Sequence, residues 1–185
     1  MIEWVLKQQT HVEKMLNEYN IRYEEIKMKN VFHYDTKIGK IGIEENGSAI
    51  TKIYFINNDE QEEIIEKNET ALLKEAIKEL NEYFDGKRTS FGLQLELQGT
   101  EFQKKVWQVL KEIPFGETRS YGEIAKLIGN EKASRAVGMA NNKNPIPIIV
   151  PCHRVIGANG KLVGYAGGLD IKEKLLKLEK DYENI

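Results

Sequence analysis

Apolar and polar residues alternate in three short stretches of the first half of the chain, at residues 31–36, 39–43 and 50–55. All three are rich in the β-branched and aromatic residues that favour strands. The residues that connect them, 37–39 and 45–48, are few and include glycine and asparagine, which are typical of turns. Short connections of this kind join antiparallel neighbours. The pattern therefore predicts a three-stranded antiparallel meander.

The spacing of apolar residues changes to three and four further along the chain, which predicts helices. A helix is expected over residues 69–84, ending at Asp85-Gly86, and residues 87–98 read as an irregular or extended linker. The first 27 residues have a weaker version of the same spacing and predict a helix of undefined packing.

The second half of the chain predicts a series of short helices. One runs from the N-cap Thr100 to about Ile113, and a second opens at the capping box formed by Ser120 and Glu123. After a turn at Gly129-Asn130, a third helix covers about residues 132–141, so that the last two form a candidate helix-turn-helix. A C-terminal helix contains Ile171, Leu175, Leu176 and Leu178.

These elements predict an α+β fold, in which a small N-terminal antiparallel sheet with a helix precedes a mostly helical C-terminal domain containing a helix-turn-helix. We expect an N-terminal helical extension at 1–27, an N-terminal α/β domain with its linker at 28–98, and a C-terminal domain at 99–185.

The third of these helices carries little side-chain bulk, since Ala133, Ser134, Ala136, Gly138 and Ala140 are all small, and we expect only Arg135, Val137 and Met139 to project from it. A bare helix can pack tightly against a neighbouring helix. It can equally approach a nucleic-acid groove closely, with Arg135 as the long side chain presented to it. The helix pattern alone leaves both interpretations open.

Charge adds modest support for a phosphate-bearing partner. The whole chain has a net charge of −2, but residues 101–185 carry 14 basic and 10 acidic side chains, and six basic against two acidic residues lie between Arg119 and Arg154. The chain has no apolar stretch long enough to span a membrane and no signal-peptide pattern at its start. With one cysteine, it is expected to reside in a reducing cytoplasm.

The single cysteine, Cys152, is the strongest chemical candidate. It follows the apolar run Ile148-Ile149-Val150-Pro151 and precedes His153 and Arg154. A lone cysteine forms no internal disulfide, which leaves packing in the core or nucleophilic chemistry. An adjacent imidazole and guanidinium are both expected to favour the reactive thiolate. Pro145 and Pro147 predict a rigid, extended path into the cysteine, on which neighbouring side chains point to opposite sides.

The sequence Pro151-Cys152-His153-Arg154-Val155, preceded by Asn144-Pro145 and by residues 134–138 (Ser-Arg-Ala-Val-Gly), resembles the signature of the O6-alkylguanine-DNA alkyltransferases, or methylated-DNA–protein-cysteine methyltransferases. The resemblance covers about Thr100 to Glu179, and the strand-rich region after Met28 is similar to the variable N-terminal domain of that family. Residues 1–27 fall outside it.

The resemblance implies direct-reversal DNA repair, in which a methyl or larger alkyl group passes irreversibly from guanine O6 to Cys152. Thymine O4 is a possible second substrate, and no cofactor is needed. His153 would accept the thiol proton through a water, with Glu179 orienting the imidazole. Tyr121 would assist base rotation and donate a proton to the leaving guanine, and Asn144 would brace the segment that leads to the nucleophile.

The resemblance also implies how DNA is bound. The target atom is inaccessible within a duplex, so the base must be flipped out. Double-stranded DNA containing O6-alkylguanine would be bound through its minor groove by a monomer, with Arg135 filling the vacated stack. The other residues expected at the DNA are Ala133, Ser134, Ala136 and Gly138, and those expected at the guanine pocket are Pro147, Val155, Tyr165 and Ala166.

Some members of the family bind zinc through N-terminal cysteine and histidine. The N-terminal half of this chain contains no cysteine, so no such metal site is expected. Three other readings remain: a cysteine hydrolase that uses Cys152 in repeated turnover, a DNA-binding lesion sensor or regulator without alkyl transfer, and a globular domain in which the thiol is only packed. Sensors within the family have replaced the cysteine, which this chain retains.

Overall fold

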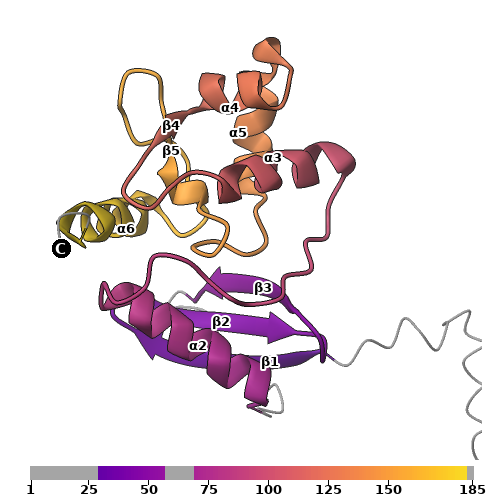
Figure 1. Ribbon diagram of the computed structural model, residues 1–185, viewed down its shortest axis with the longest axis vertical. Coiled ribbons are helices and arrows are strands. Elements are labelled where there is room, and N and C mark those ends of the chain that lie inside the picture. Colours follow the sequence, from indigo (N-terminus) through magenta and orange to yellow (C-terminus); the bar gives the residue numbers. More distant parts are fainter. Residues whose placement is uncertain (1–28, 57–68, 183–185) are drawn as a thin grey trace, which may run out of the picture.

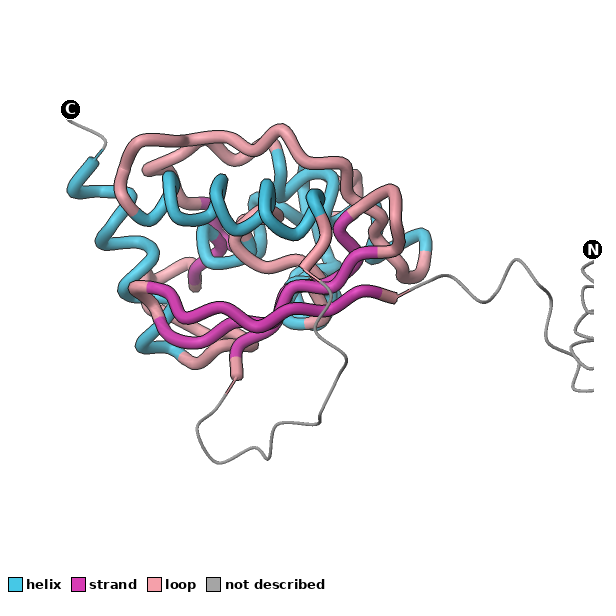
Figure 2. Tube along the Cα trace, turned by 90° about the horizontal axis from the view of Figure 1, so that it is seen from below, coloured by secondary structure: helices cyan, strands magenta, loops and turns pink. Residues whose placement is uncertain are grey.

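The N-terminal half folds as the predicted meander with one helix against it. A computed structural model describes residues 29–56 and 69–182; the helix predicted within residues 1–27 lies outside this range. Strands β1 (Asn30–Thr36), β2 (Gly39–Glu45) and β3 (Ile50–Phe55) pair antiparallel in the order β1-β2-β3, and β2 in the centre contributes the fully buried Ile41 and Ile43. Seen from below, the three strands run side by side across the molecule (Figure 2).

Helix α2 (Ala71–Phe84) covers one face of this sheet (Figure 1). The Thr70 hydroxyl caps its N-terminus by accepting a hydrogen bond from the Leu73 amide. Its buried residues recur at intervals of three and four, which places Leu73, Leu80 and Tyr83 on the face that meets the sheet and the core. Burial of these side chains accounts for the position of α2, and this position brings Tyr83 to the boundary with the second half of the chain.

Residues 87–98 are irregular, as predicted, and they are tied firmly to the N-terminal half. The Ile50 amide donates to the Gln94 carbonyl, the Glu96 amide donates to the Ile50 carbonyl, and the buried Glu79 carboxylate accepts from the Gly92 amide. This segment then leads across to α3 (Figure 1).

The C-terminal half consists of short helices around two very short strands. Its elements are α3 (Glu101–Lys111), β4 (Arg119–Ser120), α4 (Tyr121–Leu127), η2 (Glu131–Ala133), α5 (Ser134–Asn142), η3 (Cys152–Arg154), β5 (Val155–Ile156) and α6 (Leu169–Tyr182). Both predicted N-terminal caps are present, since Thr100 and Ser120 each form a reciprocal capping box with the residue three positions later. Among the described residues, no helix has the length and apolarity to cross a membrane.

Helices α4 and α5 pack against each other, joined by a turn and the single 3-10 turn of η2, in the region predicted as a helix-turn-helix. The indole Nε1 of the buried Trp107 on α3 donates to the Ala140 carbonyl on α5 at 2.8 Å. One apolar cluster runs through both halves of the molecule. The Ile53 amide of β3 also donates to the Pro145 carbonyl, so the sheet directly supports the segment that leads to Cys152.

Candidate active site

Cys152 opens a single 3-10 turn, η3, and its side chain is buried, with 2% of the residue exposed. The expectation of an extended segment here is wrong. The Cys152 amide donates to the Val150 carbonyl and the Arg154 amide donates to the Pro151 carbonyl, so the chain turns tightly at Cys152. Cys152 and His153 therefore occupy consecutive positions of a turn rather than opposite faces of a strand.

The residues before Cys152 also form a turn instead of the extended path that the two prolines suggested. The Val150 amide donates to the Ile146 carbonyl, and Ile148 between them adopts a φ of +76°. This left-handed conformation is strongly disfavoured for a β-branched residue. Ile148 is fully buried, and the surrounding packing holds it there. Backbone strain of this kind is typical of functional sites.

Two asparagine side chains, one in the last turn of α5 and one just after the helix, hold the backbone on either side of Pro151. Asn144 Nδ2 donates to the Val150 carbonyl at 2.8 Å, and its Oδ1 accepts from the Ile146 amide. Asn141 Nδ2 donates to the Cys152 carbonyl at 3.3 Å. The bracing position expected for Asn144 is therefore what the structure has, and Asn141 adds a second brace that sequence reasoning missed.

His153 and Glu179 meet in the core of the molecule, where they are 0% and 1% exposed. Nε2 of His153 lies 2.8 Å from Oε1 of Glu179, although the two residues are 26 positions apart. Glu179 thus points inward from α6, next to the buried Leu175. His153 Nδ1 is buried and has no hydrogen-bond partner among the described residues. The ring can therefore donate from Nε2 to the carboxylate while Nδ1 serves as an acceptor.

The protonation states of this pair fit a proton relay. Burial lowers the pKa of His153 against the opposing effect of Glu179, so the imidazole is neutral near pH 7 and can accept a proton. Burial alone would raise the pKa of Glu179, but hydrogen bonds and charge from His153 and Arg154 outweigh it and bring the pKa to about 2. The carboxylate is therefore ionised and able to stabilise an imidazolium.

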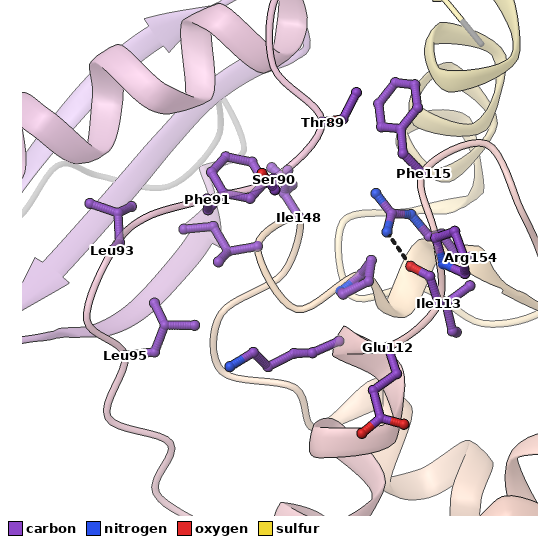
Figure 3. A pocket seen from close by; sticks show the side chains of 14 residues that line it. Thr89, Ser90, Phe91, Leu93, Leu95, Glu112, Ile113, Phe115, Ile148 and Arg154 are labelled. Atoms are coloured by element: carbon purple, nitrogen blue, oxygen red, sulfur yellow. Dashed lines mark hydrogen bonds between the residues drawn. The ribbon is translucent and has the colours of Figure 1, made fainter.

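Arg154 serves this carboxylate rather than the thiol. Its Nε and Nη2 donate to Glu179 Oε1 at 3.1 and 2.9 Å, and its Nη1 donates to the Ile113 carbonyl. The guanidinium lies beside a cavity of about 320 Å³. Figure 3 shows its hydrogen bond directed at Ile113. The expectation that Arg154 would favour a thiolate is thus wrong, because its guanidinium forms an ion pair with Glu179.

The thiol itself is protonated in the resting structure. Burial raises the pKa of Cys152 to about 11, against the lowering effects of a hydrogen bond from Asn144 and the charge of Lys172. The expectation that the adjacent imidazole and guanidinium would give a ready thiolate is therefore also wrong. A thiol with this pKa reacts only after a base removes its proton, and the neutral imidazole of His153 is able to accept one.

Lys172 is the buried cation whose charge acts on Cys152. It lies on α6, is 0% exposed, and its Nζ donates to the Val155 carbonyl at 2.6 Å and to the Val163 carbonyl at 2.9 Å. Burial lowers the pKa of Lys172 to about 8. Sequence reasoning missed this residue. A signal exists in the spacing, since residues 172, 175 and 179 are separated by three and four positions and share the buried face of α6.

Tyr121 is half-buried at the start of α4, and its hydroxyl donates to the same Val163 carbonyl at 3.1 Å. Burial and the proximity of Cys152 raise the pKa of Tyr121, so its hydroxyl keeps its proton. Val163 belongs to a loop that also contains Tyr165 and Ala166. Tyr121, Lys172 and this loop are therefore joined at one carbonyl beside the thiol.

The residues expected at the guanine pocket fall into two groups. Pro147 and Ala166 line one cavity of about 190 Å³, next to Asn144 and the end of β3. Val155 and Tyr165 are buried and do not line it. Both backbone groups of Val155 are engaged, since its amide donates to Cys152 and its carbonyl accepts from Lys172. The Tyr165 hydroxyl is buried without a hydrogen-bond partner among the described residues.

Helix α5 presents the residues expected at DNA. Arg135 and Ala136 are exposed, Ser134 and Gly138 are partly exposed, and Ala133 is buried just before the helix. Val137 is fully buried, so the expectation that it would project is wrong, whereas Met139 is 65% exposed. A groove of about 520 Å³ brings Arg135, Gly138 and Met139 together with Tyr121 and Val163. The small residues of α5 thus open a path along the helix toward Tyr121.

Family models match both halves of the chain. Residues 32–97 match the ribonuclease-like domain of 6-O-methylguanine DNA methyltransferase, and residues 101–181 match the DNA-binding domain of the same protein. Fold and site therefore define a protein of the O6-methylguanine methyltransferase class.

Individual proteins that the chain resembles belong to the same class. The methylated-DNA–protein-cysteine methyltransferase of Methanosarcina acetivorans is 56% identical over 150 residues, which cover 79% of this chain and 95% of that protein. The crystal structure of the Mycobacterium tuberculosis O6-methylguanine methyltransferase has a TM-score of 0.76 at 46% identity and covers 84% of this chain and 94% of that one. The M. tuberculosis protein in complex with DNA has a TM-score of 0.75 and covers 83% and 94%.

The chain belongs to the methylated-DNA–protein-cysteine methyltransferase family. It is a DNA-binding enzyme of DNA repair that acts by alkyl transfer.

Proposed function

We propose that this protein reverses O6-alkylguanine damage in double-stranded DNA by moving the alkyl group once and irreversibly to Cys152. The observation that supports this best is the arrangement at the thiol. A buried cysteine is supplied with a neutral imidazole that is held by an ionised carboxylate, in a chain with no other cysteine.

In the proposed reaction, the Cys152 proton passes through a water to Nδ1 of His153, and Glu179 stabilises the resulting imidazolium. The thiolate attacks the alkyl carbon, so a C–S bond forms as the bond from that carbon to guanine O6 breaks. Its electron pair stays with the guanine, which takes a proton from Tyr121, and Tyr121 regains one from the relay or solvent. The thiol proton thus balances the proton gained by guanine.

The product is a thioether, which has no good leaving group, so the thiol is not regenerated. Each chain then repairs one lesion. Cys152 is 2% exposed, so a base within a duplex cannot reach it and must leave the stack. Arg135, exposed on the bare helix α5, is suited to fill the gap while α5 lies in the minor groove. The groove between Arg135 and Tyr121 supports this placement.

Intact-mass spectrometry tests the proposal directly. After incubation with duplex DNA containing O6-methylguanine, each chain is expected to gain one methyl group, located on the peptide with Cys152, and Cys152→Ser should gain none. A molar excess of DNA should leave the yield at one methyl per chain. Repeated turnover would instead indicate a hydrolase-like reaction, and binding without any mass gain would indicate a lesion sensor.

A further inference from the structure

A hydroxyl group from the N-terminal half reaches the centre of the candidate active site. The Tyr83 hydroxyl on α2 donates to Glu179 Oε1 at 2.5 Å and lies 3.3 Å from His153 Nε2. Tyr83 is fully buried, and the two contacts span 96 and 70 positions of the sequence. The hydroxyl therefore meets the relay at the oxygen that also bonds the imidazole.

Among the described residues, the other donors to Glu179 come from the C-terminal half. They are His153, Arg154 and the Gly116 amide, which donates to Oε2 at 3.0 Å. Tyr83 is held by its own surroundings, because its ring contacts Phe84 and Phe91 on its own side and meets Phe115 edge-on across the boundary. Its hydroxyl thus has one defined direction, toward the carboxylate.

The hydroxyl acts on Glu179 as a neutral donor. Burial, followed by the charge and hydrogen bond of Glu179, raises the pKa of Tyr83 well above its ordinary value, so its proton stays in place. A hydrogen bond to the charged form of a carboxylate lowers the proton affinity of that carboxylate. Glu179 in turn determines how strongly the imidazole holds a proton. The other charged or titratable groups facing this cluster are Arg154 on η3, Lys172 on α6, and the side chains of Cys152 and Tyr165.

We propose that Tyr83 is a positioning residue of alkyl transfer: its hydroxyl fixes the Glu179 carboxylate against His153 and tunes the imidazole as a base, so that the N-terminal domain completes the proton relay. This inference rests on the proposed role of Cys152 and His153, and it extends the active site to a domain that contributes none of the residues in the Pro-Cys-His-Arg segment.

The test is Tyr83→Phe in the full chain, which removes only the hydroxyl and keeps the ring contacts. Without this donor the carboxylate becomes more basic, so the pKa of His153 should rise. We expect the acidic limb of the single-turnover rate of methyl transfer to move to higher pH by about half a unit to one unit. On that limb the rate at a given pH should therefore fall on the order of three- to tenfold. Imidazole NMR should show the same displacement, with the His153 signal assigned by its loss in His153→Gln.

Tyr34→Phe is the matched control. It also removes a hydroxyl that donates to a carboxylate, Glu69, at 3.0 Å in the same half of the molecule, but it does not contact the relay. It should leave both the pH profile and the imidazole titration unchanged. If Tyr83→Phe lowers only the melting temperature and leaves the profile and titration as in the wild type, Tyr83 is merely structural and the inference is overturned. Failure of the wild-type chain to gain a methyl group would instead overturn the proposed function.

Discussion

At the scale of single residues, the cation that matters to the nucleophile is Lys172 and not the neighbouring Arg154. The guanidinium is engaged by Glu179 and the Ile113 carbonyl, whereas the Lys172 charge lowers the pKa of the Cys152 thiol against the effect of burial. Near pH 7, below the Lys172 pKa of about 8, the ammonium is charged, and we expect Lys172→Met to leave roughly tenfold less thiolate there.

The single thiol makes this measurable as its rate of reaction with a small alkylating reagent at pH 7, with Cys152→Ser as the blank. Lys174 on the same helix is exposed, so Lys174→Met removes the same charge from a solvated position and should leave this rate unchanged. Lys172→Arg keeps the charge and should retain most of the reactivity. An equal rate in Lys172→Met and wild type would show that the ammonium only holds the loop.

The site residues divide into those that the sequence predicts and those that only the fold reveals. Cys152, His153 and Asn144 lie in one contiguous segment, so their association could be predicted from the motif. Tyr83 and Lys172 could not be assigned in this way, because each acts through a contact that depends on how separate elements pack. The apolar pattern places Tyr83 on the inner face of its helix but says nothing about the partner of its hydroxyl.

At the scale of elements, periodicity located each described strand and helix longer than three residues to within a few residues. It did not find the two-residue strands β4 and β5. What it missed is the backbone around the nucleophile. A 3-10 turn of three residues is too short to show a period, and a β-branched Ile148 at positive φ contradicts local preference. The tight geometry at Cys152 is imposed by tertiary packing.

Helix α5 carries the prediction that belongs to this scale. If Arg135 fills the vacated stack as proposed, Arg135→Ala should slow methyl transfer from duplex DNA by at least about tenfold, which corresponds to about 1.4 kcal/mol. Transfer from free O6-alkylguanine base needs no flipping and should change by less than about twofold. Single-turnover rates with the two substrates measure this difference.

Arg135→Lys provides the control for charge, since it keeps phosphate attraction but shortens and narrows the side chain. It should bind undamaged duplex nearly as well as the wild type while repairing it more slowly. Equal losses on duplex and free base in Arg135→Ala would remove Arg135 from the flipping role and point to a general disturbance of α5.

At the scale of the whole molecule, the buried relay should make folding stability depend on pH. The pKa of His153 is lower in the folded chain than the ordinary value of about 6.5. Below about pH 6.5, the unfolded chain therefore binds a proton at this histidine more readily than the folded chain does. Stability should therefore fall as the pH drops from about 6.5. Glu179 has a folded pKa of about 2 and an unfolded pKa near 4.3, so its ionisation stabilises the fold fully above about pH 4.3. This contribution is lost as the pH falls from about 4.3 toward 2.

Thermal unfolding between pH 7.5 and 5 isolates the histidine contribution, because Glu179 stays ionised in both states over most of this range. Each kcal/mol lost should lower the melting temperature by about 2–4 °C for a chain of this size. His153→Gln keeps a donor for Glu179 but cannot titrate, so its melting temperature should be flatter over this range. A slope that persists in His153→Gln would place the titration elsewhere. A slope that disappears would show that burying the neutral imidazole of the proposed relay lowers stability in acid.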